Sequence, residues 1–350
     1  MASTRDFGRS LAARCAALGI AAAATLMTTT AKADDVADFY RGKTLTFLVG
    51  FPPSGGYYAY SQLLTQFLGK HIPGQPTVIL QTMPGASSLR LVQYLMNVAA
   101  KDGLTIGMFN RGLMPQAKMK PQEMNVDFTK LTWVGSMAND ISICTLWGAK
   151  GISTIAQLRQ NHVIIGDTSK DSGGYIYASI LHSLAPDNTR TILGYATSGD
   201  VWLAMEKGEV DGNCNVWSSM KSQRPQWFSQ HQANILVQFS KVKHPELQNV
   251  PTVFEFATSD DQKKALDFLT ASDAISRPVV APLGIPDDRV KALRDAFMTT
   301  MQDPDLIAAA SKEHLDLAPI DGAAAAKIAA DITNSPQDAI DLGKKMVGIE

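Results

Sequence analysis

LTFLVGFPPSGGYYAYSQLL, residues 45–64, and TVILQTMPGASSLRLVQYL, residues 77–95, each pass from an apolar strand through a Pro/Gly/Ser-rich loop into a helix. Two such units in succession are typical of parallel strands joined by helical crossovers, so we expect both loops at one edge of the sheet. The first residues of a helix present amide groups without an intrahelical partner and carry a partial positive charge. Two such ends side by side predict a binding site for a small anion.

The composition is that of an ordinary globular protein. The chain has 350 residues, a formal net charge of -1 and a hydrophobic fraction of 45%. This length allows one large domain or two medium-sized domains with their own cores. Lysines and arginines are scattered among acidic residues, which argues against a nucleic-acid-binding face or a polybasic membrane surface. We therefore expect neither nucleic acid nor a membrane surface as a partner.

Residues 1–33 have the pattern of a secretory signal peptide. Arginines precede an apolar run over residues 15–27, and Ala31-Lys32-Ala33 fits an A-x-A cleavage site. The alternative, an N-terminal membrane anchor, needs a run of roughly 20 apolar residues, and this one is shorter. We expect cleavage after Ala33 and a mature protein in the periplasm.

The rest of the chain divides into two α/β lobes. Strand-like and helix-like segments alternate through residues 34–138 and again through residues 139–274, whereas residues 275–350 are mostly helical. The C-terminal helices must pack on a sheet. Residues 34–138 contain too few helices to cover both faces of the first-lobe sheet, so we expect the C-terminal helices there. The sequence thus predicts a first lobe of residues 34–138 and 275–350, a second lobe of residues 139–274, and two segments crossing between them.

Signatures of catalysis and of metal binding are weak. Ser218-Ser219-Met220-Lys221 fits the S-x-x-K motif of penicillin-recognising enzymes, but its companion motifs are missing, so we interpret the match as chance. The six histidines lack metal-ligand spacing. We expect no catalytic residue, no metal and no cofactor. Cys144 and Cys214 remain after cleavage, and either a disulfide or two buried free thiols fit the sequence.

The first-lobe loops supply candidate ligand-binding residues. In FPPSGGYYAYS the glycines let a ligand approach the backbone, Tyr58 is expected to face it, and Tyr60 is expected to pack on the sheet. In MPGASS the hydroxyl of Ser87 or Ser88 is expected to cap the following helix. Arg111, after the third strand, is either a bidentate clamp for a carboxylate or an arginine exposed to solvent.

The second lobe repeats the strand, polar loop and helix arrangement. Polar loops at residues 167–174 and 195–199 each precede a helix. Asp211 and Trp217 are expected to follow the next strand and to reach the cleft from that lobe. A core position is the alternative for Trp217.

These motifs resemble the periplasmic solute receptors of tripartite tricarboxylate transporters, the Bug family, over the whole mature chain. The matching stretches are FYRGKTLTFLVGFPPSGGYYAY, MPGASS, AAKDGLTIG and VPTVFE. The resemblance implies a two-lobed type II periplasmic binding protein, a Venus flytrap, in which each lobe is a mixed, mainly parallel sheet flanked by helices. It implies that the first-lobe loops hold a ligand carboxylate, partly through ordered water.

The resemblance also implies individual ligand-binding residues. Many relatives carry Asp in place of Tyr58 and Gly in place of Ser87, which makes an amino-acid ligand doubtful. With Arg111, Asp211 and Trp217 from the residue patterns, the candidates are Pro53, Ser54, Gly55, Tyr58, Gly85, Ala86 and Ser87 in the first lobe, and Thr168, Ser169, Ser172, Tyr195, Thr197 and Ser198, more loosely matched, in the second.

The sequence therefore predicts a monomeric periplasmic receptor that captures a small organic mono- or dicarboxylate and delivers it to integral-membrane transporter subunits. An aromatic acid is included, because tyrosines and Trp217 offer rings for stacking. Two alternatives stay open. One is a ligand-sensing module for a membrane kinase, and the other is a periplasmic hydrolase that uses Ser218 and Lys221.

Overall fold

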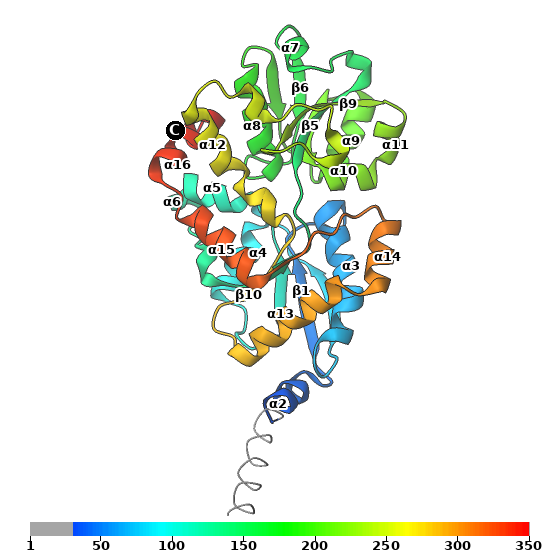
Figure 1. Cartoon of the computed structure of the whole chain (residues 1–350), viewed down its shortest axis with the longest axis vertical. Coiled ribbons are helices and arrows are strands. Elements are labelled where there is room, and N and C mark those ends of the chain that lie inside the picture. Colours follow the sequence, from blue (N-terminus) through cyan, green and yellow to red (C-terminus); the bar gives the residue numbers. More distant parts are fainter. Residues whose placement is uncertain (1–30, 350) are drawn as a thin grey trace, which may run out of the picture.

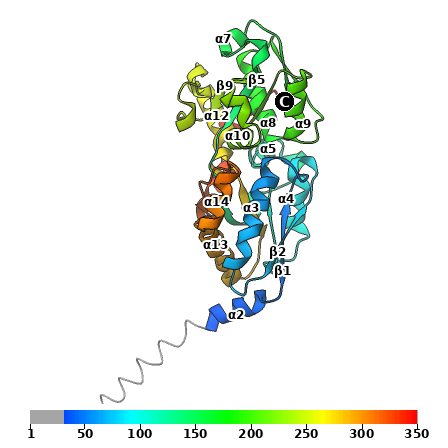
Figure 2. The same ribbon diagram turned by 90° about the vertical axis from the view of Figure 1, so that its right-hand side faces the viewer.

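A computed structural model describes residues 31–349, with side chains from Asp35 onward, and places them in two α/β lobes stacked along the long axis (Figure 1). The expected signal peptide lies outside these residues except for Ala31-Lys32-Ala33, which begin helix α2 (Ala31–Tyr40). α2 projects from the end of the first lobe that is remote from the second (Figure 2). Within the described part, no helix has the length and apolar character needed to cross a membrane.

The first lobe is built on a six-stranded mixed sheet in the order β11-β4-β10-β3-β1-β2. Parallel pairing joins β2, β1 and β3, and antiparallel pairing joins β3, β10, β4 and β11. The late strand β10 thus returns from the second lobe into the middle of the first sheet. The strands are β1 (Thr44–Val49), β2 (Thr77–Thr82), β3 (Thr105–Met108), β4 (Leu131–Ser136), β10 (Pro278–Pro282) and β11 (Ile320–Asp321).

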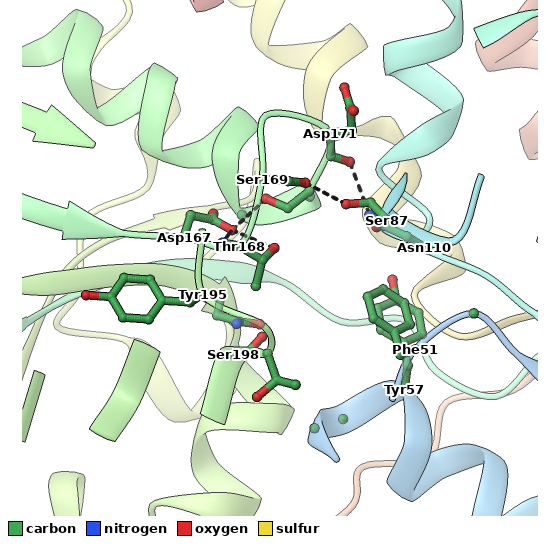
Figure 3. A pocket seen from close by; sticks show the side chains of 18 of the residues that line it. Phe51, Tyr57, Ser87, Asn110, Asp167, Thr168, Ser169, Asp171, Tyr195 and Ser198 are labelled. Atoms are coloured by element: carbon green, nitrogen blue, oxygen red, sulfur yellow. Dashed lines mark hydrogen bonds between the residues drawn. The ribbon is translucent and has the colours of Figure 1, made fainter. Parts of the chain in front are cut away.

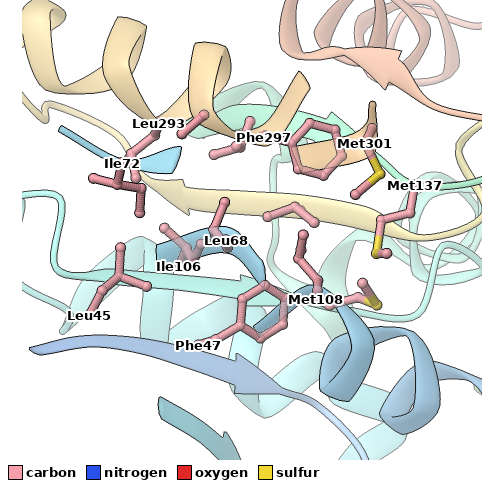
Figure 4. Close-up of a cluster of buried hydrophobic side chains, with 14 of the residues drawn as sticks. Leu45, Phe47, Leu68, Ile72, Ile106, Met108, Met137, Leu293, Phe297 and Met301 are labelled. Atoms are coloured by element: carbon pink, nitrogen blue, oxygen red, sulfur yellow. The ribbon is translucent and has the colours of Figure 1, made fainter. Parts of the chain in front are cut away.

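Helices cover both faces of this sheet because β1 is apolar on both sides. Leu45 and Phe47 point into a core shared with α3, α13 and α14 (Figure 4), whereas Leu48 points into the opposite core, shared with α4, α5 and α15. The first-lobe helices are α3 (Gly55–His71), α4 (Leu89–Asn97), α5 (Leu113–Met119), α6 (Pro121–Met124), α13 (Asp287–Met301), α14 (Pro304–Lys312) and α15 (Gly322–Thr333), with short 3-10 turns η1 (Ala86–Ser88) and η2 (Phe128–Lys130).

The second lobe holds a five-stranded mixed sheet in the order β7-β6-β8-β5-β9. Parallel pairing joins β7, β6 and β8, and antiparallel pairing joins β8, β5 and β9. The strands are β5 (Ser142–Trp147), β6 (Val163–Gly166), β7 (Thr189–Ile192), β8 (Gly212–Val216) and β9 (Ala233–Phe239). The helices are α7 (Ile155–Leu158), α8 (Gly173–Leu184), α9 (Ser198–Lys207), α10 (Trp217–Gln223), α11 (Pro225–Ser229), α12 (Asp260–Thr270) and α16 (Gln337–Val347).

The two-lobed α/β fold with mixed sheets flanked by helices is confirmed, with two differences in detail. Parallel pairing is less extensive than expected, since it joins only three neighbouring strands in each sheet. The assignment of the whole C-terminal third to the first lobe is wrong for α16. Ile340 and Val347 pack into the second-lobe core with Leu266 and Leu269 of α12, because α16 has an apolar face that this core completes.

The two cysteines are joined in a disulfide. Cys144 of β5 and Cys214 of β8 are direct partners in the antiparallel register and both are buried. Of the two alternatives that the sequence left open, the structure contains the disulfide, because strand pairing places the two side chains on the same face at the same level.

Candidate functional site

A cavity of about 330 Å³ lies between the lobes, at the carboxyl ends of the parallel strands. Phe51 and Tyr57 line it from the first lobe and face two loops of the second lobe, one with Thr168 and one that ends at Ser198 (Figure 3). Sites at this edge of α/β sheets are typical for ligands because the connecting loops and helix N-termini converge there. Both series of loops that the sequence singled out therefore meet at one site.

The first-lobe end of the cavity presents an uncapped helix N-terminus. α3 begins at Gly55, its N-cap residue Ser54 makes no side-chain hydrogen bond to the helix, and its first turn contains no acidic residue. The ring of Tyr57 stacks on Phe51 with 4.7 Å between centroids, and its hydroxyl accepts the Arg111 amide at 3.1 Å. The amide groups of the first turn are thus left for a ligand.

The second first-lobe loop has a strained backbone. Ala86, Ser87 and Ser88 have φ angles of 45°, 51° and 77°, in the left-handed region that non-glycine residues seldom adopt. Three such residues in succession store conformational energy, which is characteristic of ligand-binding segments. A Cβ on Gly50 would lie 2.0 Å from the Cβ of Ser88, so only glycine allows this loop to pack against the end of β1.

The serines of this loop do not cap the following helix as expected. Ser88 Oγ accepts the amide of Asn110 at 2.7 Å, and Ser87 Oγ lies 2.8 Å from the hydroxyl of Ser169 in the other lobe. The left-handed backbone turns both hydroxyls away from the first turn of α4. The start of α4 thus has no side-chain cap, and its first amides donate instead to the backbone of the loop, Leu89 to the carbonyl of Ala86 and Arg90 to that of Gly85.

The second-lobe end of the cavity contains a buried carboxyl group. Asp167 follows β6 and is 4% exposed, and its Oδ1 accepts the hydroxyl of Ser172 at 2.7 Å. Ser172 Oγ in turn accepts the amide of Tyr175 and caps α8. Asp167 Oδ2 has no hydrogen-bond partner among the residues that the structure describes. Burial raises the pKa of Asp167 to about 6, against the opposing effect of the hydrogen bonds from Ser172 and Thr168.

This raised pKa predicts a pH-dependent stability. The folded state holds the Asp167 proton more tightly than the unfolded state, so the contribution of this group to stability falls as the pH rises from about 4 to about 6. We expect the loss to be about 2 kcal/mol between about pH 4.5 and about pH 7, and to be absent in Asp167→Asn. Urea unfolding of both proteins across this range measures it. Asp261→Asn, at an exposed position on α12, should keep the wild-type slope, and equal slopes in all three proteins would contradict the prediction.

Arg111 lines the cavity but is neither a free clamp nor exposed to solvent. It is 3% exposed, and its Nε and Nη2 lie 3.0 and 2.9 Å from Asp273 Oδ1. Nη2 also donates to Ser142 Oγ at 2.7 Å, and the hydroxyl of Tyr177 donates to Asp273. The guanidinium is therefore occupied by a carboxylate from the segment that crosses between the lobes. A buried ion pair of this kind holds the base of the cleft together.

Four predicted residues lie outside the cavity lining. Pro53 is exposed at the tip of its loop. Neighbouring residues of a helix point about 100° apart, and here Tyr57 faces the cavity in place of Tyr58. Tyr60 is buried, as expected. The predicted residues that do line the cavity are Ser54, Gly55, Gly85, Ala86, Ser87, Arg111, Thr168, Ser169, Ser172, Tyr195, Thr197 and Ser198.

The other two misplaced residues follow from a missed strand. The sequence predicts that Asp211 and Trp217 both follow a strand, but residues 212–216 between them are themselves the strand β8. Asp211 therefore lies at its amino end, away from the cavity, where it pairs with Lys150 at 2.8 Å. Trp217 is 5% exposed and packs in the core against Phe228, with its Nε1 donating to Glu246 at 2.7 Å.

The expected aromatic walls are found in part. Phe51 and Tyr57 stack at the first-lobe side, whereas the ring of Tyr195 is directed away from that lobe (Figure 3). Phe51 belongs to the loop that the sequence singled out, so its position in FPPSGG was a usable signal. Ser219, which lines the cavity, and Arg277, which lies behind it, had no such signal, because tertiary contacts alone bring them there.

Contacts across the cleft show that the lobes are closed. The hydroxyls of Ser87 and Ser169 meet at the rim, and Gln116 Nε2 donates to the carbonyl of Lys170 at 3.0 Å. Nearer the base, Arg277 Nη2 donates to Ser219 Oγ at 2.8 Å. These bonds link segments on opposite sides of the cavity, so the two lobes enclose it.

The residues proposed for a hydrolase have other partners. Ser218 Oγ donates to Asp140, and Lys221 Nζ pairs with Glu246 at 2.9 Å and with Asp316 at 2.8 Å. Lys221 is thus bound as a charged group between two carboxylates and is not placed as a base for the serine. Among residues 35–349, no group of three or more His, Cys, Asp or Glu side chains is arranged to hold a metal ion.

Comparison with known proteins identifies the fold. No protein-family model matches the chain, and no curated protein matches it in sequence. A TctC solute-binding protein from Polaromonas matches in structure with a TM-score of 0.61 and 17% identity, over 87% of this chain and 99% of its own. This chain has the fold of a solute-binding protein. MatC from Rhodopseudomonas palustris with bound malate has a TM-score of 0.66 and 16% identity, over 87% of this chain and 99% of its own. Rpa4515 from R. palustris with adipate has a TM-score of 0.69 and 15% identity, over 88% of this chain and 98% of its own.

The solute-binding fold accounts for the whole arrangement of the site. In each match nearly the entire length of the other protein is covered, so both lobes and the cleft between them are shared. The cavity described here lies at the junction between those two lobes.

Proposed function

We propose that this chain is a periplasmic receptor of the tripartite tricarboxylate transporter type that captures a small organic carboxylate between its lobes. The observation that carries the proposal is the N-terminus of α3, which has no side-chain cap and meets the interlobe cavity beside the loop of Gly85, Ala86 and Ser87. Such ends favour an anion, and a cavity of about 330 Å³ suits a small organic acid. The structural neighbours that hold malate and adipate support the same class of ligand.

The proposed mechanism is ligand-stabilised closure. The carboxylate binds at the amides of the first-lobe loops, and the hydroxyl-rich loops of Thr168 and Ser198 then complete the cavity from the other side. A ligand stabilises the closed form only to the extent that it contacts both lobes, so second-lobe contacts convert binding into closure. The closed receptor, exported with cleavage after Ala33 and acting as a monomer, would then be recognised by membrane subunits of the transporter.

A thermal-shift screen of the mature protein, residues 34–350, tests this function. We expect at least one small organic acid to raise the melting temperature by about 5 °C at a hundredfold excess over its Kd, because a ligand that binds only the folded state stabilises it. The matched control for each acid is its amide, which has nearly the same shape without the charge. A panel in which no acid shifts the transition, or in which amides do so equally, would contradict the proposal.

A further inference from the structure

Arg277 is a buried cation that has no acidic partner among the residues described by the structure. It is 0% exposed, and its guanidinium lies between the rings of Tyr57 and Tyr60, at 4.8 and 4.5 Å from their centroids. None of the ion pairs formed within residues 35–349 includes Arg277, and its Nε has no hydrogen-bond partner there. Asp140, in the same junction, is bound by Ser218 instead. The positive charge is thus held by aromatic faces and neutral oxygens only.

This charge lies directly behind the first-lobe wall of the cavity. Tyr57 and Ser219, which both contact Arg277, line the cavity. A Cβ on Gly56 would come within 3.2 Å of Arg277 Nη2, so the guanidinium sits against the first turn of α3. Its charge adds to the partial positive charge of that helix end, in surroundings where water screens little.

The second-lobe wall carries the opposite charge. Asp167 forms none of the ion pairs among the described residues, and a Cβ on Gly174 would lie 2.3 Å from its Oδ2. Asp167 therefore sits against the first turn of α8 and already neutralises that helix end from within the protein. At the neighbouring second-lobe helix, α9, the side chain of Asp200 accepts the amide of Thr197 in a capping box. The second lobe thus has acids where the first lobe has uncapped amides.

We propose that Arg277 and Asp167 polarise the cavity and so select a ligand with one carboxylate, which lies against the first lobe, and with a hydrogen-bond donor, a hydroxyl or an ammonium group, at its second-lobe end. A dicarboxylate would place its second charge against Asp167 and is disfavoured. This inference rests on the proposed function and narrows its ligand class. Arg277 and Asp167 act through the wall residues in front of them and are positioning residues.

Calorimetry with a series of ligands of equal chain length tests the polarity. The probes are adipate, 6-hydroxyhexanoate and 6-aminohexanoate, with 6-hydroxyhexanamide as the neutral control, all at pH 8 so that Asp167 is ionised. We expect the hydroxy acid or the amino acid to bind at least about tenfold more tightly than adipate, the order of effect expected for one unfavourable charge contact. Asp167→Asn should raise the affinity for adipate and narrow that preference.

The role of Arg277 is measured by the preference for acid over amide. Arg277→Met should reduce the ratio of 6-hydroxyhexanoate to 6-hydroxyhexanamide affinity at least about tenfold, whereas Arg277→Lys, which keeps the charge, should retain much of it. A purely structural role would weaken both ligands alike. Lys221→Met is the matched control, because Lys221 is a junction cation already paired with Glu246 and Asp316, and its ratio should not change.

The results of these experiments distinguish a failure of this inference from a failure of the proposed function. Adipate as the tightest probe, with an affinity that Asp167→Asn leaves unchanged, would overturn the polarity while the carboxylate receptor stands. An acid-over-amide ratio that Arg277→Met leaves unchanged would overturn the part assigned to Arg277. Failure of every carboxylate in the wider screen would overturn both the function and the inference.

Discussion

Gly112→Ala is expected to weaken ligand binding at least about a hundredfold without lowering the stability of the unliganded protein. A Cβ at this position would lie 2.7 Å from the Cα and 3.2 Å from the amide nitrogen of Gly173 in the opposite lobe. The obstacle is backbone, which cannot rotate away as a side chain can, so the lobes would have to stay apart. Gly112 itself has a φ of -61°, which alanine adopts without strain. Within its own lobe the Cβ would approach Asn110 Oδ1 at 3.2 Å, and this side-chain atom can move aside. The variant should therefore harm the closed form far more than the open one.

Calorimetry with the tightest acid of the screen measures this effect, and urea unfolding without ligand checks the stability. Gly199→Ala is the matched control, because its Cβ would meet only Thr197 Oγ1, at 3.5 Å, an ordinary contact. The control should bind like the wild type. Wild-type affinity in Gly112→Ala would mean that the ligand does not require the close approach of Gly112 and Gly173, and the closure mechanism would then be wrong.

Removal of the disulfide in Cys144→Ala/Cys214→Ala is expected to lower the free energy of unfolding by about 4 kcal/mol. The bond joins residues separated by 70 positions in sequence, and closing a loop of that length restricts the unfolded chain strongly. Both cysteines are buried in paired strands, so the alanines also leave a small space in the second-lobe core. Urea unfolding of the oxidised wild type and of the double variant measures the difference.

Thiol reduction provides the control for the disulfide. Reduced wild type should lose about the same free energy as the double variant, whereas the variant should be insensitive to reductant. A wild type that unfolds at the same urea concentration with and without reductant would show that the bond is absent from the protein in solution or contributes nothing to its stability.

Local signals predicted the loops and helices of the site well. The run of apolar residues in β1, the Pro and Gly after it and the start of α3 are all encoded within a few neighbouring residues, as are the corresponding features of β2 and η1. Residues 275–350 were expected to be mostly helical, and they contain α13, α14, α15 and α16. Strand β8 was missed because Asn213 and Asn215 interrupt its apolar pattern. The side chain of the buried Asn213 is satisfied by a distant partner, since it donates to the carbonyl of Gly166.

By itself, the sequence determined the two-lobed α/β plan and the convergence of Gly- and Ser-rich loops on one cleft, because apolar periodicity, turn residues and helix starts act over short stretches of chain. The tertiary structure alone decided which groups stand behind those loops. Tyr57, Ser219 and Arg277 come from three distant segments and meet only when the lobes pack. The same packing pairs Arg111 with Asp273 and places α16 on the second lobe. Charge pairing and burial depend on distances between remote segments, and a local pattern contains no record of those distances.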